Sequence, residues 1–144
     1  MTLTPQEASD YLEIMTLLAR IAQLADAGDI EDYLDCFSPD GSWTLHDSHG
    51  LNLEPQVRTG REELAEGVRE RREIGLQGPG TATKHDVSSI SIDVEGDTAR
   101  ASSYFRFYRS TNLVPELIAI GRYDDELVRT PGVWRLKNRS ITRN

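Results

Sequence analysis

The sequence predicts an α+β fold in which helices pack on one face of a curved sheet. Amphipathic helical segments fill the first half of the chain, and strand-like segments separated by turn residues fill the second half. This order indicates an antiparallel sheet, because a parallel α/β sheet needs helices and strands to alternate. The chain has 144 residues, the length of one ordinary domain. We therefore expect residues 1–144 to form a single domain.

The first helix is expected to begin at Pro5 and to end at Gly28. Thr4, Pro5 and Glu7 form the pattern of a capping box with proline in the first turn. Apolar residues at helical spacing predict one buried face: Tyr11, Ile14, Met15, Leu18, Ile21, Ala22 and Ala25. Asp26 falls at the edge of this face, where a carboxylate needs a polar partner.

A short second helix is expected after its N-cap residue Asp29, with apolar residues that repeat up to Phe37. The letters "SPDG" then predict a turn into a short strand at 42–46. Residues 47–59 carry turn formers without a clear period, which predicts a loop.

A charged third helix is expected to follow this loop. Thr59 and Glu62 resemble a capping box at its start, and the segment "REELAEGVRERREIG" is amphipathic. The residues expected to face inward are Leu64, Val68 and Ile74. The glycines and the proline of "LQGPGT" then end the helix.

Four strands are expected in the second half of the chain, at 81–94, 98–110, 116–129 and 133–142. Alternation in the second strand places these residues on one face: Ala99, Ala101, Ser103, Phe105 and Phe107. Small residues followed by aromatic residues suit the wall of a narrowing cavity.

The last two strands leave two alternatives open. The inner face of the third strand is expected to carry Leu117, Ala119, Gly121, Tyr123, Asp125 and Leu127. Gly121 removes a side chain from the middle of that face, which either leaves room for a ligand or marks a bend. A bulge between Leu136 and Ile141 would turn Arg139 toward the interior, and without it Arg139 is a solvated surface residue.

The composition excludes several classes of partner. The formal charge of −8, from 24 acidic and 16 basic residues, repels the phosphates of a nucleic acid. The first residues do not resemble a signal peptide, and no apolar run is long enough to span a membrane. The single cysteine, Cys36, excludes an internal disulfide and a thiolate zinc cluster. We expect a cytoplasmic protein that binds neither nucleic acid nor membranes.

His85 stands just ahead of a strand of apolar and small residues, in a chain with only three histidines. If this strand lies under the end of the first helix, Asp26 could accept a hydrogen bond from one imidazole nitrogen. The carboxylate would fix the tautomer and leave the other nitrogen as a positioned general base. The alternative is that Asp26 is only a polar residue at the end of a helix and that His85 is a hydrogen-bonded edge residue of the strand without a catalytic role.

The other two histidines, His46 and His49, lie on either side of Asp47. Two histidines in a loop, with no third ligand specified, are weak evidence for a metal site. We therefore expect no metal and no other cofactor.

Three segments resemble SnoaL-like members of the nuclear transport factor 2-like superfamily: "IAQLADAGDIEDYLDCFSPDGSWTL", "TKHDVSSISIDVEGDTARASSYF" and "GRYDDELVRTPGVWRLKNRSI". The resemblance covers nearly the whole chain, and the order of the segments is more specific than any one of them. It implies a cone-shaped α+β barrel, in which a curved antiparallel sheet wraps around a deep apolar pocket capped by the N-terminal helices.

The resemblance also implies roles for single residues. Asp26 and His85 match the catalytic pair of scytalone dehydratase, hexachlorocyclohexane dehydrochlorinase and bile-acid dehydratases. Trp43 matches an aromatic pocket position, and Arg139 matches a basic pocket residue of the dehydrochlorinase. The chain departs from scytalone dehydratase because its later strands hold no second histidine. Polyketide cyclases and ketosteroid isomerases of the superfamily place key acids on strands, where Asp125 could serve.

The residues and the resemblance together predict a cofactor-independent lyase or isomerase. It would act on a small, apolar, cyclic molecule by dehydratase-type elimination or double-bond migration, with His85 as the base and Asp26 as its orienting residue. The expected substrate-binding residues are Trp43 and Phe105 around the ring, and Tyr123 and Arg139 at the developing negative charge. The alternatives are a polyketide cyclase that uses a strand carboxylate, and a non-catalytic ligand-binding or structural subunit of this fold. The outer sheet face predicts a homodimer or homotrimer.

Overall fold

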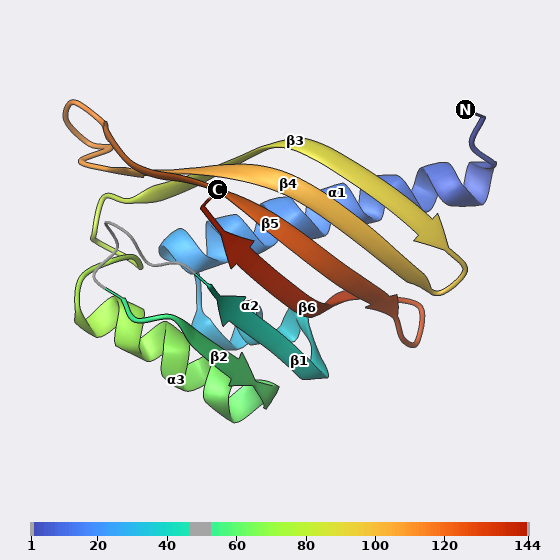
Figure 1. The fold of residues 1–144 in the computed structure, drawn as a ribbon, viewed down its shortest axis with the longest axis horizontal. Coiled ribbons are helices and arrows are strands. Elements are labelled where there is room, and N and C mark those ends of the chain that lie inside the picture. The colour runs from blue at the N-terminus through green and yellow to red at the C-terminus, as the bar shows by residue number, and fades with distance from the viewer. Residues whose placement is uncertain (1, 47–52, 144) are drawn as a thin grey trace.

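The computed structural model describes residues 2–46 and 53–143 of the chain (Figure 1). The helices are α1 (Pro5–Ala27), α2 (Ile30–Asp35) and α3 (Gly60–Glu73). The strands are β1 (Phe37–Leu45), β2 (Gln56–Thr59), β3 (Lys84–Glu95), β4 (Thr98–Arg109), β5 (Glu116–Arg129) and β6 (Trp134–Thr142). The predicted α+β class is confirmed, because the helices lie ahead of the four long strands and pack on the sheet that these strands help to form.

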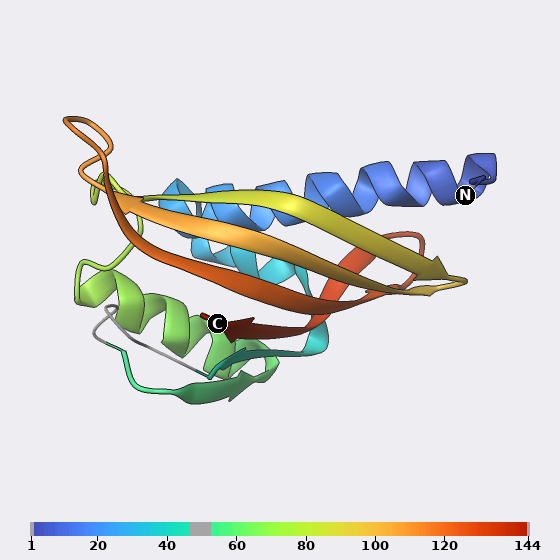
Figure 2. The same ribbon diagram turned by 45° about the horizontal axis from the view of Figure 1, so that its top comes forward.

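The strands of the described ranges form one curved, unclosed sheet in the order β2-β1-β6-β5-β4-β3 (Figure 2). Neighbouring strands run antiparallel, except that β1 and β6 pair in parallel. The predicted antiparallel pairing of the four later strands is confirmed. The departure from an antiparallel sheet is confined to β1, which lies beside the last strand, β6, and runs parallel to it.

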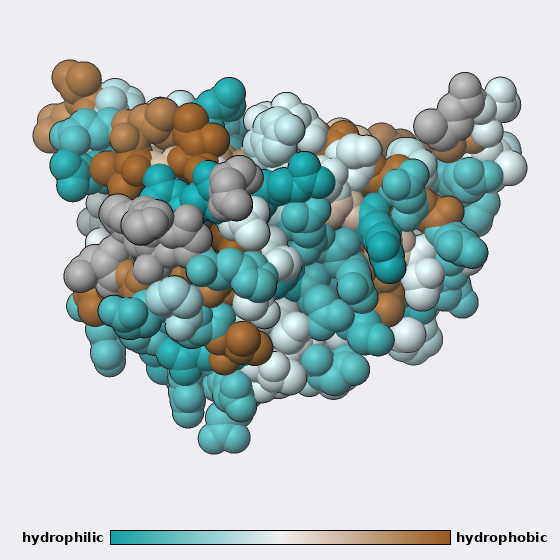
Figure 3. Space-filling model, in the orientation of Figure 1, coloured by the Kyte–Doolittle hydropathy of each residue, from teal (hydrophilic) through white to brown (hydrophobic). Residues whose placement is uncertain are grey.

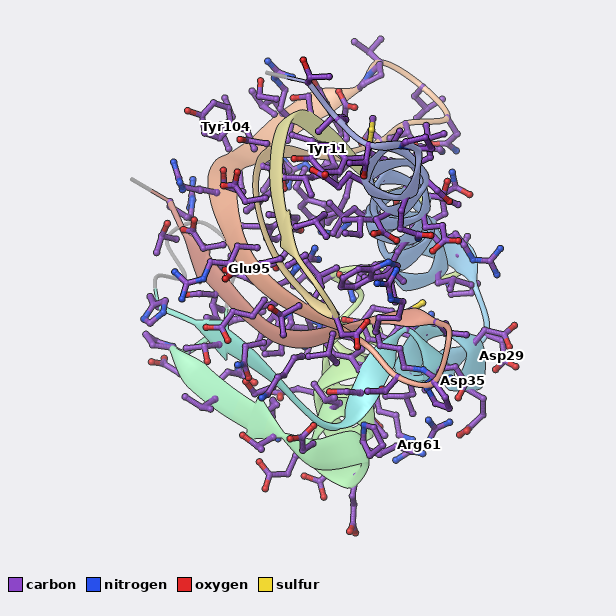
Figure 4. The ribbon with its side chains drawn as sticks, turned by 90° about the vertical axis from the view of Figure 1, so that its right-hand side faces the viewer. Tyr11, Asp29, Asp35, Arg61, Glu95 and Tyr104 are labelled. Atoms are coloured by element: carbon purple, nitrogen blue, oxygen red, sulfur yellow. The ribbon has the colours of Figure 1, made fainter. Side chains whose placement is uncertain are left out.

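The helices cover the inner side of the curved sheet. Helix α1 crosses β3, and α3 packs against β1 and β2 (Figures 1 and 2). Viewed nearly along α1, the sheet bends as an arc around packed side chains, and α1 lies across the open side of the arc (Figure 4). No helix in the described part of the chain has both the length and the apolar character needed to span a bilayer.

Helix α1 begins as its sequence predicts. The Thr4 hydroxyl accepts a hydrogen bond from the Glu7 backbone N–H at 3.1 Å, and the Glu7 carboxylate accepts one from the Thr4 N–H at 3.5 Å. The buried face is narrower than predicted, because Met15 is 46% exposed. The buried face also includes Asp10, one turn before Ile14, which accepts hydrogen bonds from the side chains of Arg129 and Trp134.

The middle of the chain corrects four predictions. The "SPDG" segment at 38–41 belongs to β1, and part of the predicted loop at 47–59 is the strand β2. Both segments are short and irregular in hydropathy, so only pairing with neighbouring strands makes them extended. At the start of α3, the carboxylate that accepts from the Thr59 N–H is that of Glu63 and not that of Glu62. Ile74 lies beyond the last turn of α3 and is half exposed.

Gly121 gives room to a neighbouring aromatic ring and not to a ligand. A Cβ atom at this position would lie 2.4 Å from the Phe105 ring and 2.6 Å from the Thr142 carbonyl oxygen. The ring of Phe105 occupies the place that a side chain would take, and it stacks on Tyr123 with ring centroids 4.6 Å apart. The interpretation of Gly121 as ligand space is therefore wrong.

Replacing Gly121 by alanine is expected to destabilise the fold by about 1–3 kcal/mol, the usual cost of overpacking a filled core. The backbone carbonyl of Thr142 cannot swing away as a flexible side chain could. Urea denaturation of the variant measures the loss. Gly132, which lies in a turn with no atom within 4 Å of a Cβ position but has φ +74°, is a control that reports backbone strain alone.

The outer face of the sheet carries exposed apolar and aromatic side chains. Tyr104 is half exposed, and Figure 4 shows it on the side of the sheet away from α1. Figure 3 shows an apolar patch over the end of the β4–β5 hairpin. The exposed apolar residues of this hairpin are Leu113, Val114, Leu117 and Ile120. The exposure of Leu117 differs from its predicted inward placement, because the register between β4 and β5 shifts at Tyr108.

We predict that this outer face mediates self-association into a dimer or trimer, since exposed aromatic and arginine side chains are enriched at interfaces. Multi-angle light scattering at micromolar concentration should report a multiple of 16.2 kDa. A Tyr104→Glu variant should shift the population toward the monomer, whereas Tyr11→Glu on the helix side should not. A wild-type protein that elutes as a monomer contradicts the prediction.

Candidate active site

A pocket lies between the end of α1, helix α2, the second half of α3 and the inner face of the sheet. Its volume is about 60 Å³, several times what one ordered water needs. The pocket contains space that no side chain fills. Most of its lining is apolar or aromatic: Ile21, Ala22, Ala25, Tyr33, Trp43, Leu45, Leu53, Leu76, Phe105, Phe107, Tyr123 and Ile141. The polar side chains on its wall are Arg71, Gln77, His85 and Arg139.

Asp26 and His85 form a closely held pair at the wall of this pocket. The Nδ1 atom of His85 lies 2.7 Å from Oδ1 of Asp26, and the backbone N–H of His85 donates to Oδ2 at 2.9 Å. Both carboxylate oxygens are therefore engaged by one residue, so the carboxylate and the imidazole hold a fixed mutual orientation. Asp26 is 8% exposed, and only His85 of the two lines the pocket.

This geometry selects the tautomer of His85. A carboxylate accepts hydrogen bonds, so Nδ1 carries the proton and Nε2 keeps its lone pair. None of the described residues forms a hydrogen bond with Nε2. The imidazole ring packs on Phe107, with ring centroids 4.5 Å apart, and both residues line the apolar pocket.

Contacts from α3 and from β3 hold the end of α1 at the site. Helix α1 ends at Gly28, and its last carbonyl groups need partners. Arg72 of α3 donates to the carbonyl oxygens of Leu24 at 3.2 Å and of Gly28 at 2.8 Å. On the other side, β3 starts at Lys84, so that His85 pairs with Phe107 of β4 and lies beside the end of α1.

Arg139 reaches the pocket because β6 contains a bulge. Leu136 pairs with Leu127, whereas Asn138 pairs with Glu126, so Lys137 is an extra residue. The bulge changes the phase of alternation and turns Arg139 inward, where it is 5% exposed. The bulged alternative of the sequence analysis is the one found.

Arg139 is paired in its buried position. Its Nε and Nη2 atoms donate to the two carboxylate oxygens of Asp125 at 2.9 and 3.0 Å. Burial acts to lower the pKa of Arg139, but the charge and hydrogen bonds of Asp125 outweigh it, and the pKa is raised. Its guanidinium carbon also lies 3.8 Å from the ring centroid of Tyr123. Burial raises the pKa of Tyr123, so its phenol stays neutral and can donate a hydrogen bond.

The structure thus brings five of the six predicted site residues to one pocket wall, and Asp26 lies directly behind His85. Asp125, the alternative strand acid, does not line this pocket, and both of its oxygens bind Arg139. A substrate in this pocket would therefore reach the Asp125 carboxylate only if the hydrogen bonds from Arg139 were broken.

The "HDSH" segment, considered above as weak evidence for a metal site, lies only in part within the described residues. Asp47 and His49 lie outside the described residues. His46 is exposed, and its Nε2 lies 2.6 Å from the Ser140 hydroxyl. The described ranges contain no group of three histidine, cysteine or acidic side chains arranged to hold a metal ion.

The sequence analysis missed two polar residues of the pocket, Arg71 and Gln77. Arg71 follows Leu64 by seven residues and Val68 by three, so helical spacing does place it on the inner face of α3. Charged side chains are usually solvated, so the expected inner face of this helix did not include Arg71. Gln77 lies in the turn after α3, where the Leu76 N–H donates to the Arg71 carbonyl at 3.0 Å. Nothing in the local sequence indicates that this turn faces a pocket.

Comparisons with known proteins agree with this architecture. Residues 6–140 match the sequence model of the SnoaL-like domain. A Nostoc punctiforme protein of unknown function with a cystatin-like fold is 26% identical over 98% of this chain and 93% of its own, with a TM-score of 0.78. No curated protein matches the chain.

Two further solved structures show the same fold at lower identity. Aln2 from a Streptomyces species is 22% identical over 99% of this chain and 94% of its own, with a TM-score of 0.79. A scytalone dehydratase-like protein from Novosphingobium aromaticivorans is 20% identical over 99% of this chain and 89% of its own, with a TM-score of 0.73.

Proposed function

Because the chain belongs to the SnoaL-like family, we propose that it is a cofactor-independent lyase or isomerase that removes a proton from carbon in a small, mostly apolar, cyclic substrate. The observation that carries the proposal is the Asp26–His85 pair at 2.7 Å, with the imidazole on the wall of an apolar pocket. A positioned imidazole base needs a hydrogen-bonding partner on one nitrogen and a free lone pair on the other. His85 has both.

In this proposal, the Nε2 atom of His85 takes a proton from a carbon next to a carbonyl group. The two electrons of the C–H bond move toward the carbonyl oxygen, and the Asp26 carboxylate stabilises the imidazolium that forms. The enolate that results can react in two ways. In an elimination, its electrons form a carbon–carbon double bond while a leaving group departs from the next carbon. In an isomerisation, another carbon of the conjugated system takes the proton from the imidazolium, and the double bond moves.

The other polar residues of the wall have roles suited to an oxyanion. The phenol of Tyr123 is neutral and can donate a hydrogen bond to the oxygen on which charge develops. Arg139 is already neutralised by Asp125, so it contributes mainly by holding Tyr123, on which its guanidinium lies. Trp43 and Phe105 would lie against the substrate ring, since both are aromatic residues of the wall.

Two alternatives are weaker on the same observations. A polyketide cyclase that uses Asp125 as its base would first have to break the Arg139 pair. A ligand-binding protein without catalysis needs the pocket, but it does not need a histidine held on both oxygens of a buried carboxylate.

Proton exchange in D₂O tests the proposal without knowledge of the natural substrate. A panel of small cyclic ketones, with and without a β-hydroxyl group, is incubated with the full chain and followed by ¹H NMR. We expect loss of the α-proton signal of at least one ketone, and loss of water from its β-hydroxy analogue. Ligands that bind without any catalysed exchange would indicate the ligand-binding alternative.

A further inference from the structure

Arg71 is a buried cation on the pocket wall that has no anionic partner among the described residues. It is 5% exposed, and no ion pair or hydrogen bond of its guanidinium occurs in the described part of the chain. Two other arginines of this region differ, Arg58 of β2 and Arg72 of α3. Arg58 pairs with Glu66 and with Glu70, and Arg72 binds carbonyl oxygens at the end of α1.

The surroundings of Arg71 place its charge beside the pocket without neutralising it. The guanidinium carbon lies 4.4 Å from the ring centroid of Trp43, a cation–π contact that offsets only part of the loss of water. A Cβ atom at Gly67 would lie 3.1 Å from Nη1, so the glycine one turn earlier leaves the guanidinium its space. Burial, and then the charge of Arg58, lower the pKa of Arg71.

Proteins rarely bury a charge without pairing it, because the lost hydration has to be replaced. Arg139 on the same wall follows this rule through Asp125. Arg71 does not, although Glu70 is its neighbour in the sequence, because Glu70 binds Arg58 instead. A partner that the described residues do not supply can come from the molecule that fills the pocket.

Gln77 adds a second unengaged polar group to the pocket wall. Its side chain is 5% exposed, lines the pocket, and forms no hydrogen bond with any described residue. The hydrogen bond from the Leu76 N–H to the Arg71 carbonyl ties the turn that precedes Gln77 to the end of α3, and both side chains line the pocket. A guanidinium and a neutral amide together can bind an oxyanion through charge-assisted and neutral hydrogen bonds.

We propose that the pocket takes a ring compound that carries an oxyanion, either a carboxylate or a phenolate or enolate, and that Arg71 is the residue that binds it. The inference rests on the proposed function in that it names the substrate class for the same site. It assigns the anion to the unpaired Arg71 and not to Arg139, which Asp125 already neutralises. The oxyanion then fixes the substrate in the pocket that holds the base His85.

Binding of unreactive probes to the full chain tests this inference separately from catalysis. Isothermal titration would compare benzoate with benzamide, which has the same shape without the charge, and 4-nitrophenolate with 4-nitroanisole. Wild-type protein should prefer at least one anion over its neutral analogue by about 10- to 100-fold, the range of a hydrogen bond to a charged group. The anion that binds more tightly identifies the oxyanion.

Three variants decide which residue gives the preference. Arg71→Met keeps the apolar stem and should abolish the preference for the anion while leaving the neutral probe within about threefold. It should not lower the melting temperature, since it removes an unpaired buried charge. His85→Ala should keep the preference, so a protein without activity still tests the inference. Gln77→Leu should weaken anion binding less than Arg71→Met does.

Equal binding of anionic and neutral probes by the wild type would overturn the inference. So would a preference that survives in Arg71→Met. A preference lost in Arg71→Met but retained in His85→Ala would support it whether or not the D₂O exchange experiment detects catalysis.

Discussion

Replacing His85 by alanine is expected to lower kcat by about 10²–10⁴-fold on any substrate that the wild type turns over, the usual contribution of a positioned general base. The variant should remain folded, because within the described residues the imidazole makes one side-chain hydrogen bond, to Asp26, and that carboxylate still accepts from the backbone N–H of residue 85. Steady-state kinetics measure the loss, and circular dichroism confirms the fold. His46→Ala is the matched control, since His46 is an exposed histidine bonded to Ser140, and it should keep wild-type activity.

Substitution of Asp26, the partner of His85, tests the same mechanism a second time. Asp26→Asn should also reduce kcat strongly, because the amide NH₂ can donate to Nδ1 and so favour the wrong tautomer. The double variant should be little slower than the slower single variant, since residues that act as one unit are not additive. Full activity in His85→Ala, together with its loss in Asp125→Asn, would assign the chemistry to the strand carboxylate and contradict the proposal.

Replacing Arg139 by methionine is expected to lower the free energy of unfolding by about 3–5 kcal/mol, the usual cost of breaking a buried ion pair. The variant leaves Asp125, which is 3% exposed, as a buried carboxylate without its partner. Urea denaturation measures the loss. This large effect contrasts with the neutral or stabilising effect expected at Arg71, although both arginines line one pocket.

Two controls separate the ion pair from the loss of side-chain volume. Arg122→Met removes an exposed arginine that pairs with Asp124, and it should cost at most about 1 kcal/mol. The double variant Arg139→Met with Asp125→Leu should recover most of the stability, because no unpaired charge then remains. If Arg139→Met is no more costly than Arg122→Met, the buried pair does not stabilise the fold.

The sequence by itself predicts features that depend on neighbours along the chain. The capping box of Thr4 and Glu7, the apolar stripe from Ile14 to Ala25 and the alternation of β4 are all set by periods of a few residues. The bulge at Lys137 shows itself as a change in apolar phase along one strand. Residue type, position and the family resemblance indicate Asp26 and His85 as a candidate pair, but the sequence does not give the distance between them.

Only the tertiary structure decides which distant residues meet. The parallel pairing of β1 with β6 and the contact of Asp26 with His85, 59 residues apart, depend on the order of strands in the sheet. The same order pairs Asp125 with Arg139, whereas Arg71 of α3 is buried without a carboxylate partner among the residues that the structure describes. The sequence does not distinguish an arginine that is exposed to solvent from one that is buried with or without a charged partner. Its state depends on the water and charges around it, and those are set by elements that fold together from separate parts of the chain.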